Sequence, residues 1–152
     1  METIDFTNSI KIAIGGDSEV YALNNIVYKK WRLPFEQVRL YQRVTDKCTN
    51  VHFLFDRFEI KVLPLDRVFK KDDHVFSVSK KIEGTMINNI QQPDKQKLGF
   101  YFQRELTPQL SKISNSEGIN IITWNAMLMS DNKSVWITDI ASDVSSVSIS
   151  EI

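Results

Sequence analysis

The feature that most constrains the fold of this chain is a series of three short β-prone segments joined by two tight turns. The first segment, Ile10–Ile14, alternates isoleucine with lysine or alanine, which is the period of a strand with one buried face. Gly15–Ser18 provides the first turn and leads into Glu19–Leu23, and Asn24–Asn25 provides the second and leads into Ile26–Trp31. Strands connected in this way predict an antiparallel β-meander.

A helix is predicted directly after the meander. Pro34 suits the first turn of a helix, and apolar residues then recur at every third position as far as Lys47. We expect the charged segment Lys70–Asp73 to be the loop of a hairpin. Three further β-prone stretches lie at Val51–Phe55, Phe58–Leu63 and His74–Ser79.

The pattern changes in the second half of the chain. Leucine, phenylalanine and isoleucine fall every three or four residues over Asp94–Ile113, which predicts a long amphipathic helix. We expect Pro108 to kink or restart this helix, with Thr107 capping the second piece, and Asn115–Gly118 to end it. A final hairpin is predicted from two β-like runs, Ala126–Met129 and Val135–Asp139.

Composition excludes several classes of protein. With 152 residues, of which 42% are hydrophobic, the chain is expected to form one globular domain. Its formal net charge of +0 lacks the positive field of a duplex nucleic-acid binder, so no nucleic-acid partner is expected. The single cysteine, Cys48, cannot form an internal disulfide, and His52 and His74 lack the sequence partners of a zinc site.

The chain also lacks recognisable membrane and export signals. No apolar run approaches the roughly 20 residues that a membrane-spanning helix needs. Residues 1–6 are acidic and lack the basic and apolar regions of a signal peptide. We therefore expect a cytoplasmic protein, either in its own cell or in the cytosol of a host.

Three features could carry chemistry, and each also has an ordinary structural explanation. The Gly15–Gly16 turn lets backbone amides approach a phosphate without a Cβ in the way, although such a pair is also a common hairpin turn. Lys29 lies on a neighbouring strand and either reaches a phosphate as a point charge or faces solvent at a sheet edge. Asn125 and Asp139 flank the last hairpin and offer oxygen ligands for Mg²⁺, or merely occupy a turn and a strand end.

The order of these features resembles the protein-kinase-like fold: strand, glycine turn, two strands with a lysine, helix, strands, long helix, asparagine, hairpin, aspartate. The resemblance covers about residues 10–141, and its nearest variety is the compact kinase-like effectors of enteric pathogens. It implies a minimal α+β fold, with an antiparallel β-sheet N-lobe containing one helix and a rudimentary helical C-lobe with a short β-hairpin. The implied parts of this single domain are N-lobe-like residues 1–81, hinge-like 82–85, reduced C-lobe-like 86–141 and a serine-rich tail 142–152.

The resemblance implies that ATP and Mg²⁺ are the cofactors. The kinase loop G-x-G-x-x-G-x-V, anchored on Val20, falls here so that only its second glycine, Gly15, is present. Val27–Lys29 resembles the end of the V-A-I-K strand, so Val20 and Val27 would enclose the adenine and Lys29 would bind phosphates. Ser79–Gly84 resembles the segment that links the two lobes, whose backbone would contact the adenine edge. The implied cofactor-binding residues are Gly15, Gly16, Ser18, Val20, Val27, Lys29 and Glu83.

The same resemblance implies that Asn125 and Asp139 bind the metal, because Trp124–Leu128 resembles the catalytic-loop asparagine and Ile137–Ala141 the D-F-G region. Five residues before Asn125, the catalytic base of the family would fall on Asn120, which cannot accept a proton. Loss of a general base slows a reaction by about 10²–10⁴-fold.

Two further departures from the family pattern concern the lysine's partner and the chain's length. Glu36 is the only glutamate in the first helix, and it lies earlier than the family's partner of the lysine. The 13 residues after Asp139, 140–152, leave no room for an activation loop.

Three functions remain open at this point. The first is a pseudokinase that still binds ATP and works through a protein partner. The second is an active, compact Ser/Thr-type phosphotransferase, since positioning and Mg²⁺ electrostatics carry most of phosphoryl transfer. The third is an unrelated α+β interaction module, in which Val27–Lys47, with six basic and two acidic residues, could face an acidic partner. The two kinase interpretations expect Lys29 and Asp139 to converge on one cleft.

Overall fold

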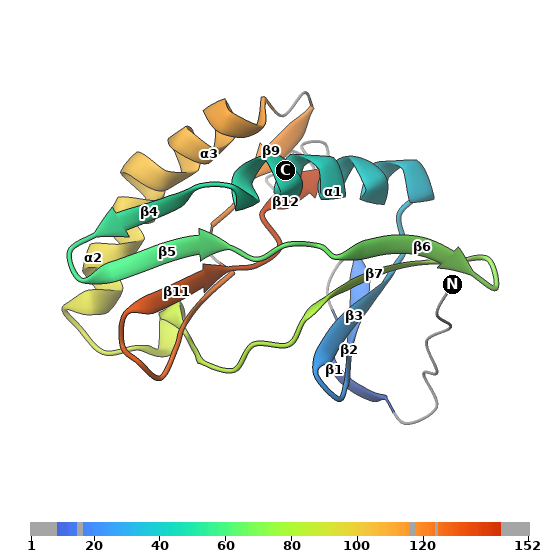
Figure 1. Cartoon of the computed structure of the whole chain (residues 1–152), viewed down its shortest axis with the longest axis horizontal. Coiled ribbons are helices and arrows are strands. Elements are labelled where there is room, and N and C mark those ends of the chain that lie inside the picture. Colours follow the sequence, from blue (N-terminus) through green and yellow to red (C-terminus); the bar gives the residue numbers. More distant parts are fainter. Residues whose placement is uncertain (1–8, 15–16, 116–117, 124, 144–152) are drawn as a thin grey trace, which may run out of the picture. The chain divides into compact units, whose positions relative to one another are not determined.

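The computed structural model describes residues 9–14, 17–115, 118–123 and 125–143 (Figure 1). The chain divides into two compact units. The first consists of Met1–Gln42 and Leu65–Ile82, and the second of Arg43–Pro64 and Glu83–Ile152. The boundary falls inside helix α1 (Phe35–Thr49), so the segment 43–64, which the sequence placed in the N-lobe-like part, groups with the second unit.

The first unit contains a five-stranded antiparallel sheet with the strand order β1-β2-β3-β7-β6. The meander predicted from the sequence is confirmed, because β1, β2 and β3 follow one another and pair as neighbours. The five strands are β1 (Ile10–Ile14), β2 (Ser18–Leu23), β3 (Ile26–Trp31), β6 (Arg67–Lys71) and β7 (His74–Lys80).

Strand β6 was not predicted from the sequence, and the prediction of a loop over Lys70–Asp73 was wrong in part. Lys70 and Lys71 belong to β6, where they pair with the first residues of β7. Only Asp72 and Asp73, with φ of 51° and 64°, make the turn. The sequence suggested a loop here because two consecutive lysines interrupt the apolar–polar alternation of a strand. In the structure, backbone pairing with β7 holds both lysines in the sheet.

The two faces of this sheet pack differently. On one face, Tyr28, Phe76 and Val78 form a buried cluster. Tyr21 stacks on Tyr28 at a ring separation of 5.0 Å within it. On the other face, Trp31 meets Tyr41 of α1 edge-on at 5.8 Å. The α1 residues of this unit thus cover the face that carries Trp31 and leave the aromatic cluster on the opposite side.

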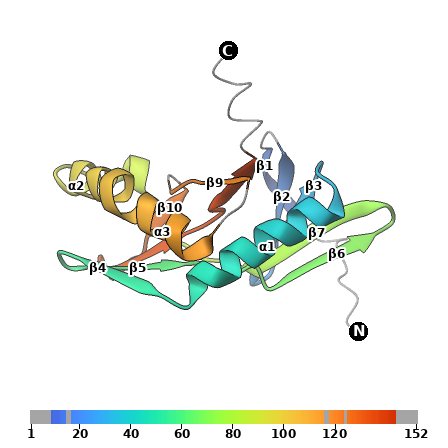
Figure 2. The same ribbon diagram turned by 90° about the horizontal axis from the view of Figure 1, so that it is seen from above.

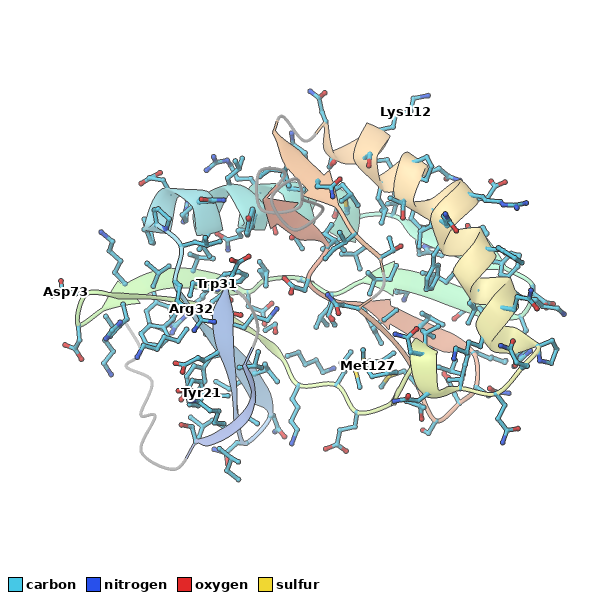
Figure 3. All side chains as sticks on the ribbon, turned by 180° about the vertical axis from the view of Figure 1, so that it is seen from behind. Tyr21, Trp31, Arg32, Asp73, Lys112 and Met127 are labelled. Carbon is cyan, nitrogen blue, oxygen red and sulfur yellow. The ribbon has the colours of Figure 1, made fainter. Side chains whose placement is uncertain are left out.

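The second unit contains a mixed five-stranded sheet with the order β4-β5-β11-β10-β8, in which β5 and β11 run parallel (Figure 1). Met127 of β10, labelled in Figure 3, lies between Trp136 of β11 and Met86 of β8. The predicted hairpin over residues 126–139 is confirmed as β10–β11. The strands are β4 (His52–Phe55), β5 (Phe58–Val62), β8 (Thr85–Met86), β10 (Ala126–Leu128) and β11 (Ser134–Ile137).

A second, two-stranded sheet in this unit pairs β9 (Ile119–Ile121) with β12 (Ala141–Asp143). The short helix η1 (Ile87–Asn89) precedes the long helical region, in which α2 (Asp94–Tyr101), the π-helical turn η2 (Phe102–Leu106) and α3 (Thr107–Ser114) follow one another. Helix α3 lies beside β9 (Figures 1 and 2).

The long helix is confirmed, and α3 starts at Thr107 with Pro108 in its first turn, as expected for a restart at this proline. The predicted cap by Thr107 is wrong. Thr107 has helical φ and ψ of −57° and −47°, and its hydroxyl does not cap the helix but lies 2.8 Å from the hydroxyl of Thr123. The helix accommodates Pro108 through the π turn directly before it, where a proline ring and its missing N–H disturb an α-helix most. The predicted end of the helix is confirmed at Asn115, which adopts the left-handed conformation and donates its N–H to the carbonyl of Ser111.

Contacts within the second unit join its hairpin and helices. The Arg57 guanidinium, in the β4–β5 turn, donates to both carboxylate oxygens of Asp94 at the start of α2 (2.7 and 3.4 Å), which lowers the pKa of that carboxyl. The ring of Phe55 stacks on that of Tyr101 at 4.4 Å. Among the described residues, none of the helices has the length and apolar character needed to cross a bilayer.

Candidate functional site

Four of the residues proposed to contact a nucleotide lie on one face of the first unit's sheet. Register pairs Ser18 with Trp31, Val20 with Lys29, and Ala22 with Val27. Because side chains alternate along a strand, Ser18, Val20, Val27 and Lys29 all project from the face opposite Tyr21 and Tyr28. The face therefore offers two valines, a hydroxyl and an ammonium group next to one another.

The ammonium group of Lys29 rests against a fixed aromatic ring. Its Nζ lies 5.5 Å from the ring centre of Trp31, two residues along the same strand, which is a cation–π contact of about 0.5–1 kcal/mol. The indole Nε1 of Trp31, a residue labelled in Figure 3, donates to the hydroxyl of Ser77 at 2.9 Å in buried surroundings. Since Ser77 lies directly opposite Lys29 in the sheet, the row Val20–Lys29–Ser77 is held across three strands.

A second contact holds Trp31 from the side of the helix. The ring of Tyr41 meets the indole edge-on, and the Tyr41 hydroxyl accepts a hydrogen bond from the Gln37 amide at 3.1 Å. Tyr41 is 2% exposed and Ser77 is 2% exposed. The base on which Lys29 rests is therefore rigid.

No acidic side chain occupies the buried face of α1. The buried positions of this helix are Val38, Tyr41, Val44, Thr45 and Cys48. Its two acidic residues, Glu36 in the first turn and Asp46 near the end, are both exposed. Where the kinase resemblance would place a carboxylate on the buried face, this helix thus presents apolar and hydroxyl groups.

Asn125 and Asp139 lie at the same end of the β10–β11 hairpin in the second unit. The carbonyl oxygen of Asn125 accepts hydrogen bonds from the backbone N–H and the hydroxyl of Thr138, at 2.7 and 3.1 Å. Asp139 follows directly and has a positive φ of 56°, which turns the chain away from the strand. The structure therefore brings the two proposed metal ligands to one end of one hairpin.

The donor set at this hairpin end fits Mg²⁺ in kind. A side-chain amide and a carboxylate supply hard oxygen atoms, which Mg²⁺ prefers to nitrogen and sulfur. Within the described ranges, no three or more His, Cys, Asp or Glu side chains are grouped to hold a metal ion. An ion at Asn125 and Asp139 would therefore take its other ligands from phosphates and water.

Asn120, at the proposed position of the catalytic base, lies in the middle of β9. It pairs with Ser142 of β12, and its neighbours Ile119 and Ile121 are buried. Only three residues, 122–124, separate the end of β9 from Asn125. The sequence from Gly118 to Asn125 contains no aspartate, glutamate or histidine.

The remaining predicted residues lie at the linking segment and in the glycine turn. Glu83 is exposed and opens the second unit's longer segment. Its neighbour Gly84 packs against β10 so closely that an added Cβ would lie 2.6 Å from the carbonyl oxygen of Leu128. Gly15 and Gly16 lie outside the described residues. Lys29 belongs to the first unit, and Asn125 and Asp139 to the second.

Sequence reasoning missed the residues that support Lys29. The alternation of Ile26–Trp31 already placed Trp31 on the face of Lys29, but nothing marked its partner Ser77 as structural. A single serine inside the apolar run Val75–Val78 is the signal that could have identified it, because a buried hydroxyl needs a hydrogen-bond partner.

Comparisons with known proteins give a likeness of structure without a likeness of sequence. No family model and no curated protein matches the chain. The crystal structure of the Mycobacterium tuberculosis PknI kinase domain matches with a TM-score of 0.52 and 14% sequence identity, over 90% of this chain and 61% of that domain. A cysteine-to-alanine mutant of the same domain gives a TM-score of 0.52 and 13% identity, over 92% and 63%. The apo form of PpkA-294 matches less well, with a TM-score of 0.44 and 18% identity, over 86% and 56%.

The two PknI matches show the fold. The chain spans 61–63% of the length of the PknI kinase domains. Their likeness is consistent with an α+β arrangement in which a five-stranded antiparallel sheet and a helix precede a long helix and a hairpin. It removes the alternative of an unrelated α+β fold. The chain has a minimal protein-kinase-like fold.

Proposed function

We propose that this protein is a pseudokinase that binds ATP with Mg²⁺ and works through a protein partner. The observation that carries the proposal is the position of Asn120. It lies in a paired strand, and the residues from there to Asn125 offer no group that accepts a proton at neutral pH. The row Val20–Lys29–Ser77, in contrast, retains the groups that a nucleotide needs.

The parts of the nucleotide site have separate tasks. Val20 and Val27 supply apolar surface for the adenine, and the ammonium of Lys29 and the hydroxyl of Ser18 lie on the same face for the phosphates. The proposal also assigns adenine contacts to the backbone around Glu83 and phosphate contacts to Gly15 and Gly16. When bound at Asn125 and Asp139, Mg²⁺ would neutralise phosphate charge.

A thermal-shift titration with Mg-ATP tests nucleotide binding. At about 100 times Kd, a ligand stabilises the folded state by about 2.7 kcal/mol, so a rise in Tm is expected. Lys29→Met should abolish this rise. Lys30→Met is the matched control, because Lys30 neighbours Lys29 on β3 but projects from the opposite face. No rise in Tm, or equal rises in both variants, would remove ATP from the proposed function.

Partner and location are also proposals. A protein partner is expected because a kinase-like fold that lacks a catalytic base can still act by binding another protein. Because the chain resembles pathogen effectors, we expect it to bind this partner in the cytoplasm, either of its own cell or of a host.

One observation favours an active phosphotransferase as a second candidate. Asn125 and Asp139 lie together at one hairpin end, and positioning with Mg²⁺ electrostatics carries most of phosphoryl transfer. Incubation with γ-labelled ATP would then give a labelled protein, and Asp139→Asn would abolish the label. This substitution keeps the backbone, because asparagine tolerates the positive φ at this position, and removes only the charge. Label that persists in the variant would contradict the role of Asp139.

A further inference from the structure

A cavity of about 830 Å³ lies in the second unit, and Glu83, Asn125 and Asp139, which the proposal above assigns to the nucleotide and its metal in this unit, are not among its described lining residues. Its walls are α2 with the following π turn on one side and residues 121–123 on the other. Ile87, Phe102, Ile121 and Ile122 are buried and give it an apolar floor. Its volume lies in the range of roughly 300–1,000 Å³ that is typical of ligand sites.

Gly99, in the wall of this cavity, has no reason within the chain itself to be a glycine. It lies in the helical interior of α2, where glycine is less favourable than alanine. A Cβ added to Gly99 would meet no atom within 4 Å. The missing side chain instead leaves the helix backbone open to a group that approaches from outside. The π turn Phe102–Leu106 begins three residues later, and such turns are frequent at functional sites.

The polar lining of the cavity distinguishes between kinds of occupant. Four carboxamide side chains line it, and each carries both a hydrogen-bond donor and an acceptor, as a peptide backbone does. They are Asn88, Gln92, Gln96 and Gln103. All four are exposed, and Gln92 Oε1 accepts the backbone N–H of Gln96 at 3.0 Å. A fatty acid or another apolar molecule with a single polar end would make hydrogen bonds to few of these groups. A polypeptide segment matches them.

The charge and shape of the cavity lining indicate two further properties of its occupant. Among the described lining residues, Lys95 is the one with a charged side chain, so a carboxylate in the occupant complements it. Phe100, at the rim, is 47% exposed, and the Arg104 guanidinium lies 5.0 Å from its ring centre. The space over Gly99 and the apolar floor accept a bulky apolar side chain.

We propose that this cavity binds a short polypeptide segment of a partner protein, with a bulky apolar side chain over Gly99 and a carboxylate beside Lys95. The inference rests on the partner-binding part of the proposed function and names the surface that serves it. It does not depend on ATP, because no described residue that is proposed to contact the nucleotide lines the cavity.

Selection of a phage-displayed random peptide library against the full chain tests the proposal. The selected peptides should share a large apolar residue and an aspartate or glutamate. In fluorescence-anisotropy titrations, Gly99→Leu and Lys95→Glu should each weaken binding of a selected peptide by about tenfold or more. Two matched controls should bind as the parent does. Lys112→Glu reverses the charge of an exposed lysine of α3, and Gln109→Leu adds a leucine at an exposed position of the same helix, both outside the cavity lining.

The outcomes separate this proposal from that of nucleotide binding. Failure to enrich any peptide, or equal binding to Gly99→Leu and the parent, would overturn the cavity as a peptide site. So would octanoate or anilinonaphthalene sulfonate binding in the cavity when the selected peptides do not compete, since the occupant would then be a small amphipathic anion. A Tm rise with Mg-ATP, measured on the same protein, is unaffected by any of these results. A folded Gly99→Leu is verified by its circular dichroism spectrum and a cooperative thermal transition.

Discussion

At the scale of single residues, the same substitution at two glycines of the second unit is expected to change the free energy of unfolding in opposite directions. An added Cβ at Gly84 would lie 2.6 Å from the carbonyl oxygen of Leu128, whereas one at Gly99 would meet nothing within 4 Å. Gly84→Ala must push β8 from β10, so we expect it to lower the free energy of unfolding by about 1–3 kcal/mol. Gly99→Ala should raise it by up to about 1 kcal/mol, because alanine favours the helix. Urea unfolding monitored by tryptophan fluorescence measures both changes.

The pair serves as its own control, since both substitutions add one methyl group to the same unit. Equal effects of the two substitutions would contradict the close packing of Gly84 against β10. A loss of stability in Gly99→Ala would show that α2 does have a packing reason for its glycine, and would weaken the argument for the cavity.

Where the alternation of a strand was regular, the sequence predicted which face of the sheet each side chain occupies. The faces of β3 followed from the order of Ile26–Trp31, and Lys29 and Trp31 were placed on one face correctly. The hydrogen bond from Trp31 to Ser77 was not predictable, because its two residues are 46 positions apart and only strand pairing brings them together. Whether Lys29 and Asp139 share one site stays a prediction.

At the scale of elements, a pair of hydroxyls joins the long helix to the segment that leads into Asn125. The Thr107 and Thr123 oxygens lie 2.8 Å apart, and Thr123 is buried. Thr107→Val and Thr123→Val should each lower the free energy of unfolding by about 1 kcal/mol, because each leaves a hydroxyl without its partner. The double variant should lose less than the sum, since both polar groups are then replaced by methyl groups of similar shape.

Urea unfolding of the four proteins in this double-mutant cycle gives the coupling energy between the two side chains. Additive effects would mean that the hydroxyls do not stabilise each other and that the helix is held at this segment by apolar packing alone. A change in the urea dependence of one variant would instead indicate a change in its unfolded state.

Elements were predictable where their signals are local. The meander, the first helix, the long helix and the last hairpin follow from alternation, spacing and turn residues within short windows. The parallel pairing of β5 with β11, and the antiparallel pairing of β9 with β12, join segments distant in sequence, so no window contains both partners. The π turn directly before Pro108 was not predicted, because such a turn has no pattern in the sequence.

At the scale of the whole molecule, the order of elements was the most informative part of the sequence. No single motif identified the fold, and the 13–14% identity to the PknI kinase domains is too low for sequence comparison to show it. The order of strands, helix, long helix and hairpin nevertheless matched the fold that these structures share with the chain. Sequences this different can share a topology because topology depends on patterns of apolar residues, which tolerate wide substitution.

The reactivity of the single cysteine reports on unfolding of the protein. Cys48 is 0% exposed, its sulfur lies 3.8 Å from the carbonyl oxygen of Leu110, and burial raises the pKa of the thiol to about 11. Near neutral pH the thiol is therefore both covered and protonated, so a disulfide reagent should react slowly in buffer. Its reaction should speed up along the urea unfolding curve. Fast labelling of the folded protein would contradict the burial of Cys48.

The same pKa predicts how stability changes at alkaline pH. Well below pH 9.0, the ordinary pKa of a thiol, Cys48 is protonated in the folded and unfolded states alike. As the pH rises from there towards about 11, the unfolded chain releases the proton and the folded chain keeps it, so the free energy of unfolding decreases. Cys48→Ala should remove this part of the decrease, although it lowers stability overall by opening a small space. The difference between the two pH profiles isolates the thiol from the tyrosines and lysines that titrate in the same range, and parallel profiles would show that its pKa is the same in both states.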